Sequence, residues 1–191
     1  MYSRKKRKTV AIVCHSRDSY DGKIATYIRE GVESAELSSK QYDCSYTKNM
    51  LDELTGSDAI IFGSPSYFGA APAKMKEFMD QTSSIWQNKL WSNKIAGAFT
   101  HSSSLSGDKL SVLQQFFIFA QQHGMIWVGL DVKSCQMKEH HQKLNYLGSW
   151  SGLMTLSSDK NQVLAYDNET DKLTARYFGA RIAKITKGLN L

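Results

Sequence analysis

The chain has 191 residues, of which 41% are hydrophobic and 22% are charged, and this balance is typical of one globular domain. No apolar run approaches the roughly 18 residues that a membrane span needs, and no secretory signal pattern opens the chain, so we expect neither a span nor export. The three cysteines, Cys14, Cys44 and Cys135, are odd in number and widely separated. This spacing favours free thiols over a disulfide framework and predicts a cytoplasmic location.

The formal net charge is +6 at pH 7, and part of it lies in the basic run Arg4–Lys8, directly before the first apolar segment. Such a run can bind nucleic acid or serve as an import signal. However, no later segment repeats it, and aromatic residues do not alternate with the basic ones as they do in single-strand binders. We therefore expect residues 1–8 to form a flexible basic leader without a nucleic-acid partner, and residues 9–191 to form a single domain.

The first half of this domain predicts two buried strands with a helix between them. Thr9–Cys14 and Asp58–Gly63 are short, continuous apolar runs, as expected for parallel strands buried on both faces. Between them, apolar and small residues recur at helical spacing over Ile24–Val32. The polar segment that follows indicates only a weak strand around Tyr42–Tyr46 and a short helix near Asn49–Leu54.

The second half predicts two more buried strands, Lys94–Thr100 and Met125–Leu130, and three amphipathic helices. The residues that form the apolar faces of these helices are, in order, Met75, Phe78 and Met79; Leu110, Leu113, Phe116, Phe117 and Ala120; and Ala175, Phe178, Ile182 and Ile185. The first helix is expected to end before Trp86, and segment 131–170 predicts no regular element. Because strands and helices alternate, we expect an α/β domain with a doubly wound parallel sheet.

The loops that follow parallel strands open at the same edge of the sheet. The loop after the first strand, His15–Ile24, offers serine hydroxyls, a glycine and a helix N-terminus, where free backbone N–H groups attract phosphate. It contains neither G-x-G-x-x-G nor G-x-x-x-x-G-K-[ST], which argues against a dinucleotide loop or a Walker loop. It is a candidate phosphate cradle for a mononucleotide, although polar strand-to-helix turns also occur in α/β domains that bind no phosphate.

Aromatic and hydroxyl groups dominate the next two loops. After Pro65, two aromatic residues, Tyr67 and Phe68, lie among small residues, where they can stack on a flat ring or simply pack. The loop His101–Gly107 is rich in hydroxyl groups that suit the polar edge of such a ring. A phosphate cradle, an aromatic wall and a polar loop at one edge of the sheet together predict an FMN site.

The segments that carry these features resemble the flavodoxin-like NAD(P)H:quinone oxidoreductases and NADPH-dependent FMN reductases, including flavoproteins similar to the Trp-repressor-binding protein. The segments that carry the resemblance are Asp58–Asp80, Lys94–Gly107, Gln122–Met125 and Thr174–Arg181. The resemblance implies a five-stranded, flavodoxin-like sheet of strand order 2-1-3-4-5 and an enzyme that uses FMN. It also implies NADH or NADPH as co-substrate and a quinone or similar flat molecule as electron acceptor. Because segment 131–170 is unlike that of the tetrameric quinone reductases, we expect a homo-oligomer that is a dimer.

Carried over position by position, the resemblance assigns most of the three loops to FMN. The matching residues are Ser16, Gly22, Lys23 and Ile24 for the phosphate; Pro65, Ser66, Tyr67, Phe68 and Gly69 for the ring; and Thr100, His101, Ser102, Ser103, Ser104 and Gly107 for the pyrimidine edge. Trp86 and Tyr67 would stack on the substrate, while His123 would either reach the flavin or simply end its helix. No side chain is needed as a catalytic acid or base, because the flavin carries the chemistry.

The first loop departs from the family pattern. It is about two residues longer than the usual form of the loop, Ser-x-Tyr-Gly-x-[Thr/Ile], and it contains Asp18 and Asp21. Carboxylates beside a phosphate are unfavourable unless they point away or are neutralised. Arg17 and Lys23 are the nearby cations that could neutralise them. We otherwise expect both aspartates to be turn formers.

Three other interpretations remain open from the sequence. A single-electron carrier of the flavodoxin type would use the same fold, but such carriers are usually strongly acidic, whereas this chain is basic. A binding protein that has lost FMN would explain the altered first loop. Cys135, Glu139, His140 and His141 lie close together, but their spacing fits no common structural zinc pattern, so no metal site is expected.

Overall fold

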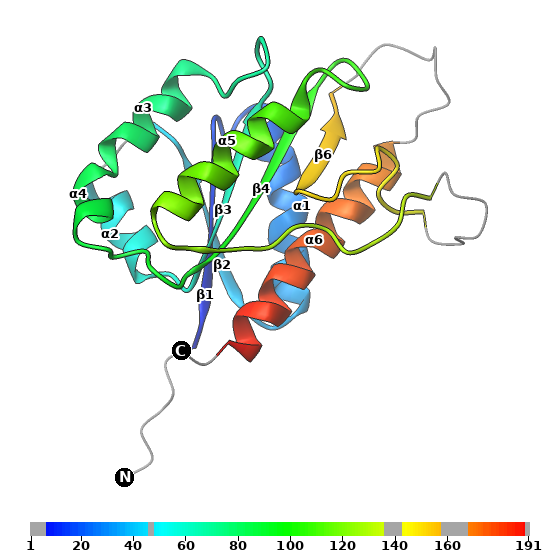
Figure 1. Cartoon of the computed structure of the whole chain (residues 1–191). Helices are drawn as coiled ribbons and strands as arrows, with labels where there is room; N and C mark the ends of the chain where they lie inside the picture. Colours follow the sequence, from blue (N-terminus) through cyan, green and yellow to red (C-terminus); the bar gives the residue numbers. More distant parts are fainter. Residues whose placement is uncertain (1–6, 46–47, 136–142, 158–167, 190–191) are drawn as a thin grey trace.

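The computed structural model describes residues 7–45, 48–135, 143–157 and 168–189, which form a sheet with helices on both faces (Figure 1). The strands are β1 (Thr9–Cys14), β2 (Ser38–Asp43), β3 (Ala59–Pro65), β4 (Ile95–Ser102), β5 (Ile126–Trp127) and β6 (Leu153–Leu156). The helices are α1 (Tyr20–Ser34), α2 (Lys48–Gly56), α3 (Ala73–Gln81), α4 (Ser83–Gln87), α5 (Lys109–Gln122) and α6 (Asn168–Gly188).

The strands are parallel and follow the order β2-β1-β3-β4-β5, which confirms the predicted fold class. The central strands β1 and β3 are almost wholly buried, because their continuous apolar runs face a helix layer on each side. Helices α1 and α6 cover one face of the sheet, and α2, α3 and α5 cover the other (Figure 1). Each face therefore has its own hydrophobic core, centred on Phe178 on the α6 side and on Phe62 and Phe116 on the α5 side.

Two of the predicted strands differ in their bounds. The weak strand expected around Tyr42–Tyr46 is β2, which begins earlier, at Ser38, and ends at Asp43. It lies at the edge of the sheet and is half exposed, so its sequence lacks the apolar run that marks β1 and β3. The strand expected over Met125–Leu130 is reduced to Ile126–Trp127.

A sixth strand, which the sequence did not predict, pairs with β4 on the same side as β5. Within segment 131–170, β6 pairs in parallel with the carboxyl half of β4, so that Phe99 lies opposite Leu153. The position next to β4 is thus filled by β5 at the amino half of β4 and by β6 at its carboxyl half. Gly129 lies where these segments meet, and a Cβ there would overlap the carbonyl oxygen of Trp150 at 2.1 Å.

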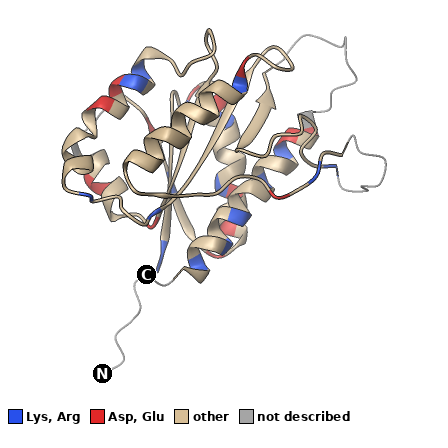
Figure 2. Ribbon diagram, viewed as in Figure 1, with Lys and Arg blue, Asp and Glu red and all other residues tan. Residues whose placement is uncertain are grey.

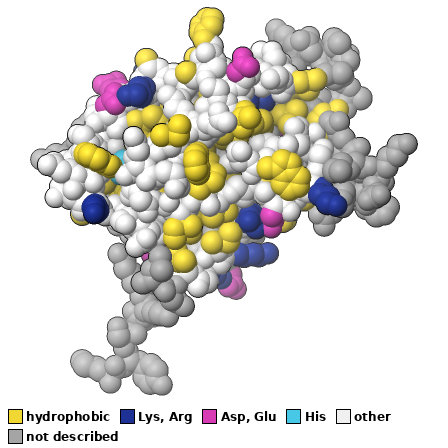
Figure 3. Space-filling model, viewed as in Figure 1, with side chains coloured by type: hydrophobic (Ala, Val, Ile, Leu, Met, Phe, Trp, Pro, Cys, Tyr) yellow, Lys and Arg dark blue, Asp and Glu magenta, His cyan; other side chains and the backbone are white. Residues whose placement is uncertain are grey.

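Helix α5 presents an unusual outer face. Leu110 and Phe117, which the sequence assigned to its apolar face, are exposed together with Ile118, while Leu113 and Phe116 are buried. After Lys109 the helix contains no charged residue (Figure 2), and its exposed side chains contribute to the hydrophobic areas seen in Figure 3. The outer face of α5 is therefore uncharged and carries three exposed apolar side chains among serine and glutamine residues.

The structure describes only the last two residues of the expected basic leader, Arg7 and Lys8. Residues 1–6 of the expected leader lie outside the described residues, but Arg7 and Lys8 contact the domain. The Arg7 guanidinium donates to the carbonyl oxygen of Glu36 at 3.0 Å, and Lys8 Nζ donates to that of Thr186 at 2.8 Å.

In the described part of the chain, no helix is both long and apolar enough to cross a membrane. All three cysteines are free thiols.

Candidate functional site

The carboxyl ends of β1, β3, β4 and β6 bring the predicted loops to one edge of the sheet (Figure 1). The second and third loops are joined directly. The Ser66 amide donates to the carbonyl oxygen of His101 at 2.8 Å, and the Ser66 hydroxyl donates to that of Gly107 at 2.7 Å. The aromatic loop and the hydroxyl-rich loop are therefore one structural unit, as the sequence predicts.

Tyr67 and Phe68 project from this unit. Tyr67 and Ala70 exchange backbone hydrogen bonds across a tight turn whose central residues, Phe68 and Gly69, both have positive φ, as in a type I′ turn. Tyr67 is 58% exposed and Phe68 is fully exposed. In Figure 3 this loop forms the apolar projection at the top of the molecule. A large side chain in the left-handed region is strained, and such strain gathers at functional sites.

Beside this turn, four buried polar atoms have no hydrogen-bond partner. They are Thr100 Oγ1, Thr155 Oγ1 and both ring nitrogens of His101. His101 and Thr155 lie opposite each other where β4 and β6 pair. Buried polar atoms normally have partners because leaving them unpaired is costly. Their presence at this edge suits a ligand with hydrogen-bonding groups.

A buried lysine supports the hydroxyl-rich loop from below. Lys109 Nζ donates to Ser102 Oγ at 2.8 Å and to the carbonyl oxygen of Ser104 at 2.5 Å. Burial lowers the pKa of Lys109 to about 8, and the carboxylate of Asp171 opposes this effect. The sequence did not reveal this residue, because a lysine at the start of a helix is ordinarily solvated. Lys109 fixes the loop and places a cation beneath it.

The first loop is organised around Asp21, which is only 1% exposed. The Ser16 amide donates to Asp21 Oδ2 at 2.8 Å, and the Ser19 hydroxyl donates to Asp21 Oδ1. The next amide, that of Arg17, donates to Asp43 Oδ2 at 3.2 Å. Asp21 is thus more than the turn former expected from the sequence, because its carboxylate is an internal acceptor for the loop.

Asp21 also connects the first loop with β4. His101 Nε2 lies 3.8 Å from Asp21 Oδ1, and the Tyr20 ring packs on the His101 ring at 4.8 Å between centroids. Burial alone would raise the pKa of Asp21, but the nearby His101 and the bonds from Ser19 and Ser16 together hold it below the ordinary value. The Tyr20 hydroxyl donates to the carbonyl oxygen of Leu156. The first loop, β4 and β6 therefore share one buried network.

The fit to FMN differs between the two ends of this site. The exposed aromatic turn and the unpartnered atoms of β4 suit the ring and its polar edge. At the phosphate end, the amides of Ser16 and Arg17 already donate to carboxylates. Gly22 and Ile24 are buried, while Lys23 is exposed, as is the Arg17 side chain. The residues present fit the ring of FMN, and the phosphate end carries its own anion.

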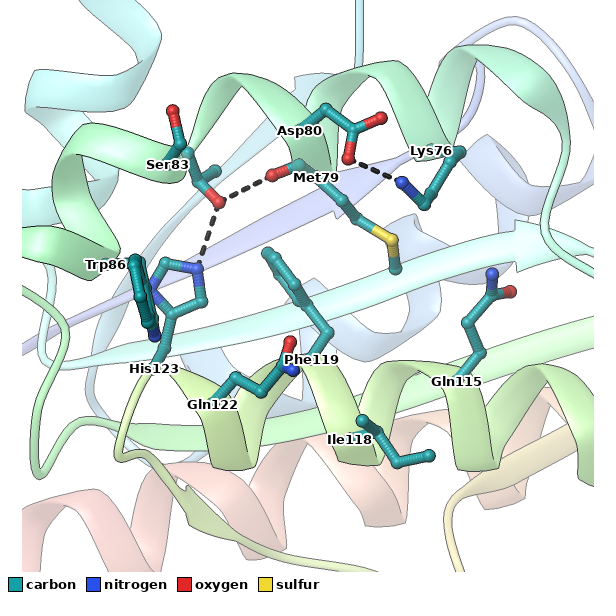
Figure 4. A pocket seen from close by; sticks show the side chains of 11 residues that line it. Lys76, Met79, Asp80, Ser83, Trp86, Gln115, Ile118, Phe119, Gln122 and His123 are labelled. Carbon is teal, nitrogen blue, oxygen red and sulfur yellow. Dashed lines mark hydrogen bonds and ion pairs between the residues drawn. The ribbon is translucent and has the colours of Figure 1, made fainter.

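Trp86 and His123 lie at the opposite edge of the sheet. Helices α3 and α5 run away from the carboxyl edge, and Gly124, the residue after His123, bonds to Asn93, just before β4. Both side chains line a groove of about 390 Å³ between α3–α4 and α5 (Figure 4). Trp86 is 54% exposed. The prediction that groups these two residues with the three loops is therefore not met within one chain, because each follows a helix that crosses the sheet.

His123 ends α5 and is packed into the core there. The Thr82 hydroxyl donates to the carbonyl oxygen of Met79 at 2.7 Å, so Thr82 Oγ1 accepts from His123 Nε2 at 2.9 Å. The imidazole packs against Trp91 and Phe119, and its Nδ1 is buried without a partner. Burial lowers its pKa to about 4. Neither ring nitrogen of His123 points to the three loops.

Comparison with known proteins identifies one family and several similar chains. The family described as NADPH-dependent FMN reductase matches residues 23–136. A protein of Pseudomonas aeruginosa named flavodoxin FldP is 31% identical over 94% of this chain and 97% of its own length. An NAD(P)H dehydrogenase (quinone) of Geobacter sulfurreducens is 33% identical over 73% of this chain and 67% of its own. The crystal structure of a WrbA-like flavodoxin from Agrobacterium tumefaciens superposes with a TM-score of 0.71 at 30% identity, covering 96% of this chain and 99% of that one.

Proposed function

The chain belongs to the NADPH-dependent FMN reductase family, and from this premise we propose that it passes electrons from NADH or NADPH through FMN to a quinone or similar flat acceptor. The resemblance seen in the sequence is confirmed, and the chain is an FMN-dependent oxidoreductase. The quinone acceptor is supported by the name of the Geobacter relative. When bound, FMN would supply the redox chemistry: acceptance of a hydride from the nicotinamide and delivery of two electrons to the acceptor.

The observation that carries this proposal is the junction between the aromatic turn and the end of β4. Ser66 bonds to the backbone of His101 and Gly107, so the exposed Tyr67 turn adjoins the end of β4, where Thr100 Oγ1 and the His101 ring nitrogens have no hydrogen-bond partner. An aromatic wall next to hydrogen-bonding groups is the arrangement that holds a flat, polar-edged ring. In this assignment the Tyr67 turn covers the ring, while Thr100, His101 and the loop Ser102–Gly107 bind its pyrimidine edge.

Lys109 has a supporting role in this assignment. Its amine holds Ser102 and Ser104, so the loop presents a fixed set of donors and acceptors. The Lys109 cation would also stabilise negative charge on a ring held by this loop, because an opposite charge in a partly desolvated site interacts strongly. Reduction of the ring would therefore be easier with Lys109 than without it.

Steady-state turnover tests the reaction. The protein with added FMN is expected to oxidise NADH or NADPH in the presence of a soluble benzoquinone, and Tyr67→Ala is expected to lose most of this activity. Trp150→Ala, which removes a similarly exposed aromatic side chain (53% against 58% for Tyr67) outside the three loops and outside α5, is the matched control and should retain it. A wild-type protein that binds FMN but does not oxidise either nucleotide would refute the proposed reaction.

The same assay separates a flavodoxin-type carrier, which the name of the Pseudomonas relative favours. A carrier would exchange electrons with a partner reductase and would not accept a hydride from a free nucleotide. The formal charge of +6 argues against a carrier, because such carriers are usually acidic. Nucleotide oxidation without any added reductase therefore favours the enzyme.

We also infer that the protein acts as a homodimer in the cytoplasm. Trp86 would reach a flavin only if that flavin were bound to a second copy, because the three loops of its own chain lie at the other edge of the sheet. The outer face of α5 supports such a contact, because it combines exposed Phe117 and Ile118 with the absence of charge. Sedimentation velocity should give a dimer, and Ile118→Glu should give a monomer; a monomeric wild type would contradict this assembly.

The proposed cytoplasmic location has separate support. The three cysteines are free thiols, which is consistent with a reducing compartment.

A further inference from the structure

The first loop holds an anion of its own where a phosphate would be expected. Both oxygens of the buried Asp21 carboxylate accept hydrogen bonds within the loop, one from the Ser16 amide and one from the Ser19 hydroxyl. Backbone amides at the start of a helix are the groups that normally bind phosphate. Asp21 therefore uses donors that a cofactor phosphate would need.

The surroundings keep Asp21 in this position. Gly22 lies against the loop so closely that a Cβ would meet the carbonyl oxygen of Arg17 at 1.9 Å. His101 lies 3.8 Å from the carboxylate and favours its charged form. Arg17 and Lys23, the cations expected to neutralise it, are both exposed. The negative charge in the loop is thus offset by hydrogen bonds and His101, with no cation of the loop packed against it.

We propose that Asp21 is a specificity-determining residue that prevents the phosphate of a flavin from contributing to binding. This inference rests on the proposed function, because it concerns the same flavin site. A phosphate that enters the loop must either displace the carboxylate from the Ser16 amide or lie beside it, and two anions in a partly desolvated loop repel each other. Flavins with and without a phosphate then bind with similar affinity.

The ratio of the dissociation constants for riboflavin and FMN tests this proposal, because it isolates the contribution of the phosphate. Both constants are measured by quenching of flavin fluorescence. For the wild type the ratio is expected to be below about 3, whereas Asp21→Asn, which keeps an acceptor for Ser16 but removes the charge, should raise it at least about tenfold. Asp21→Ser, which also frees the Ser16 amide, should do the same and provides a second variant if the first is unstable.

Asp18→Asn is the matched control, because Asp18 is an exposed carboxylate of the same loop. It removes an equal charge without touching the Ser16 amide and should leave the ratio within about threefold of wild type. A wild-type ratio above about 100, or an equal rise for the Asp18 and Asp21 variants, would overturn the proposal.

Inorganic phosphate provides a readout that does not depend on flavin binding. Amide NMR spectra of the folded proteins are recorded with increasing phosphate. The Ser16 and Arg17 amides should shift in Asp21→Ser and stay unchanged in wild type. If neither riboflavin nor FMN binds to any of the proteins, the proposed function fails, and the phosphate titration alone decides the role of Asp21. Equal shifts in both proteins would refute that role.

Discussion

Acidification is expected to destabilise this protein through His123 at the end of α5. The imidazole donates from Nε2 to Thr82, and a second proton would have to enter at Nδ1, which is buried beside Trp91 and Phe119 without a partner. Burial therefore lowers the pKa of His123 from the ordinary value of 6.5 to about 4. Because the folded-state pKa is the lower one, the unfolded chain binds the proton first as the pH falls.

The magnitude follows from this difference in pKa. No stability is lost above the unfolded-state pKa of 6.5, and the full loss is reached near the folded-state pKa of about 4. At 1.36 kcal/mol for each pKa unit, the complete effect is about 3 kcal/mol, and about 2 kcal/mol is already lost near pH 5. This loss is specific to His123 and should vanish when the imidazole is replaced.

Urea unfolding of wild type and His123→Gln at about pH 7.5 and about pH 5 measures this effect. The variant is less stable at the higher pH because it disturbs the packing against Trp91, but it should lose about 2 kcal/mol less than wild type on acidification. His15→Gln, which replaces a half-buried histidine at the opposite edge of the sheet, is the control and should follow wild type. Equal losses in wild type and His123→Gln would show that the imidazole is not shielded as described.

Three further substitutions test the carboxyl edge. Gly22→Ala should displace the first loop, because its Cβ would lie 1.9 Å from the Arg17 carbonyl oxygen. Its free energy of unfolding in urea should fall by about 1–3 kcal/mol, and an unchanged free energy would contradict the close packing. Lys109→Met removes the donors to Ser102 and Ser104 and should cost about 1–3 kcal/mol in the same assay, whereas a stabilised variant would argue against its role in the loop. Phe68→Asn relieves a positive φ and should raise thermal stability by about 0.5–1 kcal/mol while weakening FMN binding; a loss of stability would mean that the turn is unstrained.

The fold could be predicted from the sequence where burial leaves a clear pattern. β1 and β3 are buried on both faces, so their apolar runs marked them directly. The edge strand β2 is half exposed, and its polar sequence placed it several residues too late. β6 was missed because it is only four residues long, and its place beside β4 is set by tertiary pairing.

The site was predictable in its layout but not in its internal contacts. Parallel strands bring the Tyr67 turn and the loop after β4 together, and their joining by Ser66 agrees with that prediction. No local pattern reveals that Asp21 folds back onto Ser16 or that Lys109 is buried, because both depend on groups that meet only in three dimensions. The sequence also could not show that α3 and α4 carry Trp86 to the far edge of the sheet, away from the loops of its own chain.

The most direct test of the account is a titration of the cofactor-free protein with FMN, followed by visible absorbance and fluorescence quenching. Wild type should bind FMN and perturb its spectrum, Tyr67→Ala should bind at least about tenfold more weakly, and Trp150→Ala should bind as wild type does. An FMN spectrum that is unchanged by the wild-type protein would contradict the flavin site. Equal affinities of wild type and Tyr67→Ala would place the flavin elsewhere than at the turn between β3 and α3.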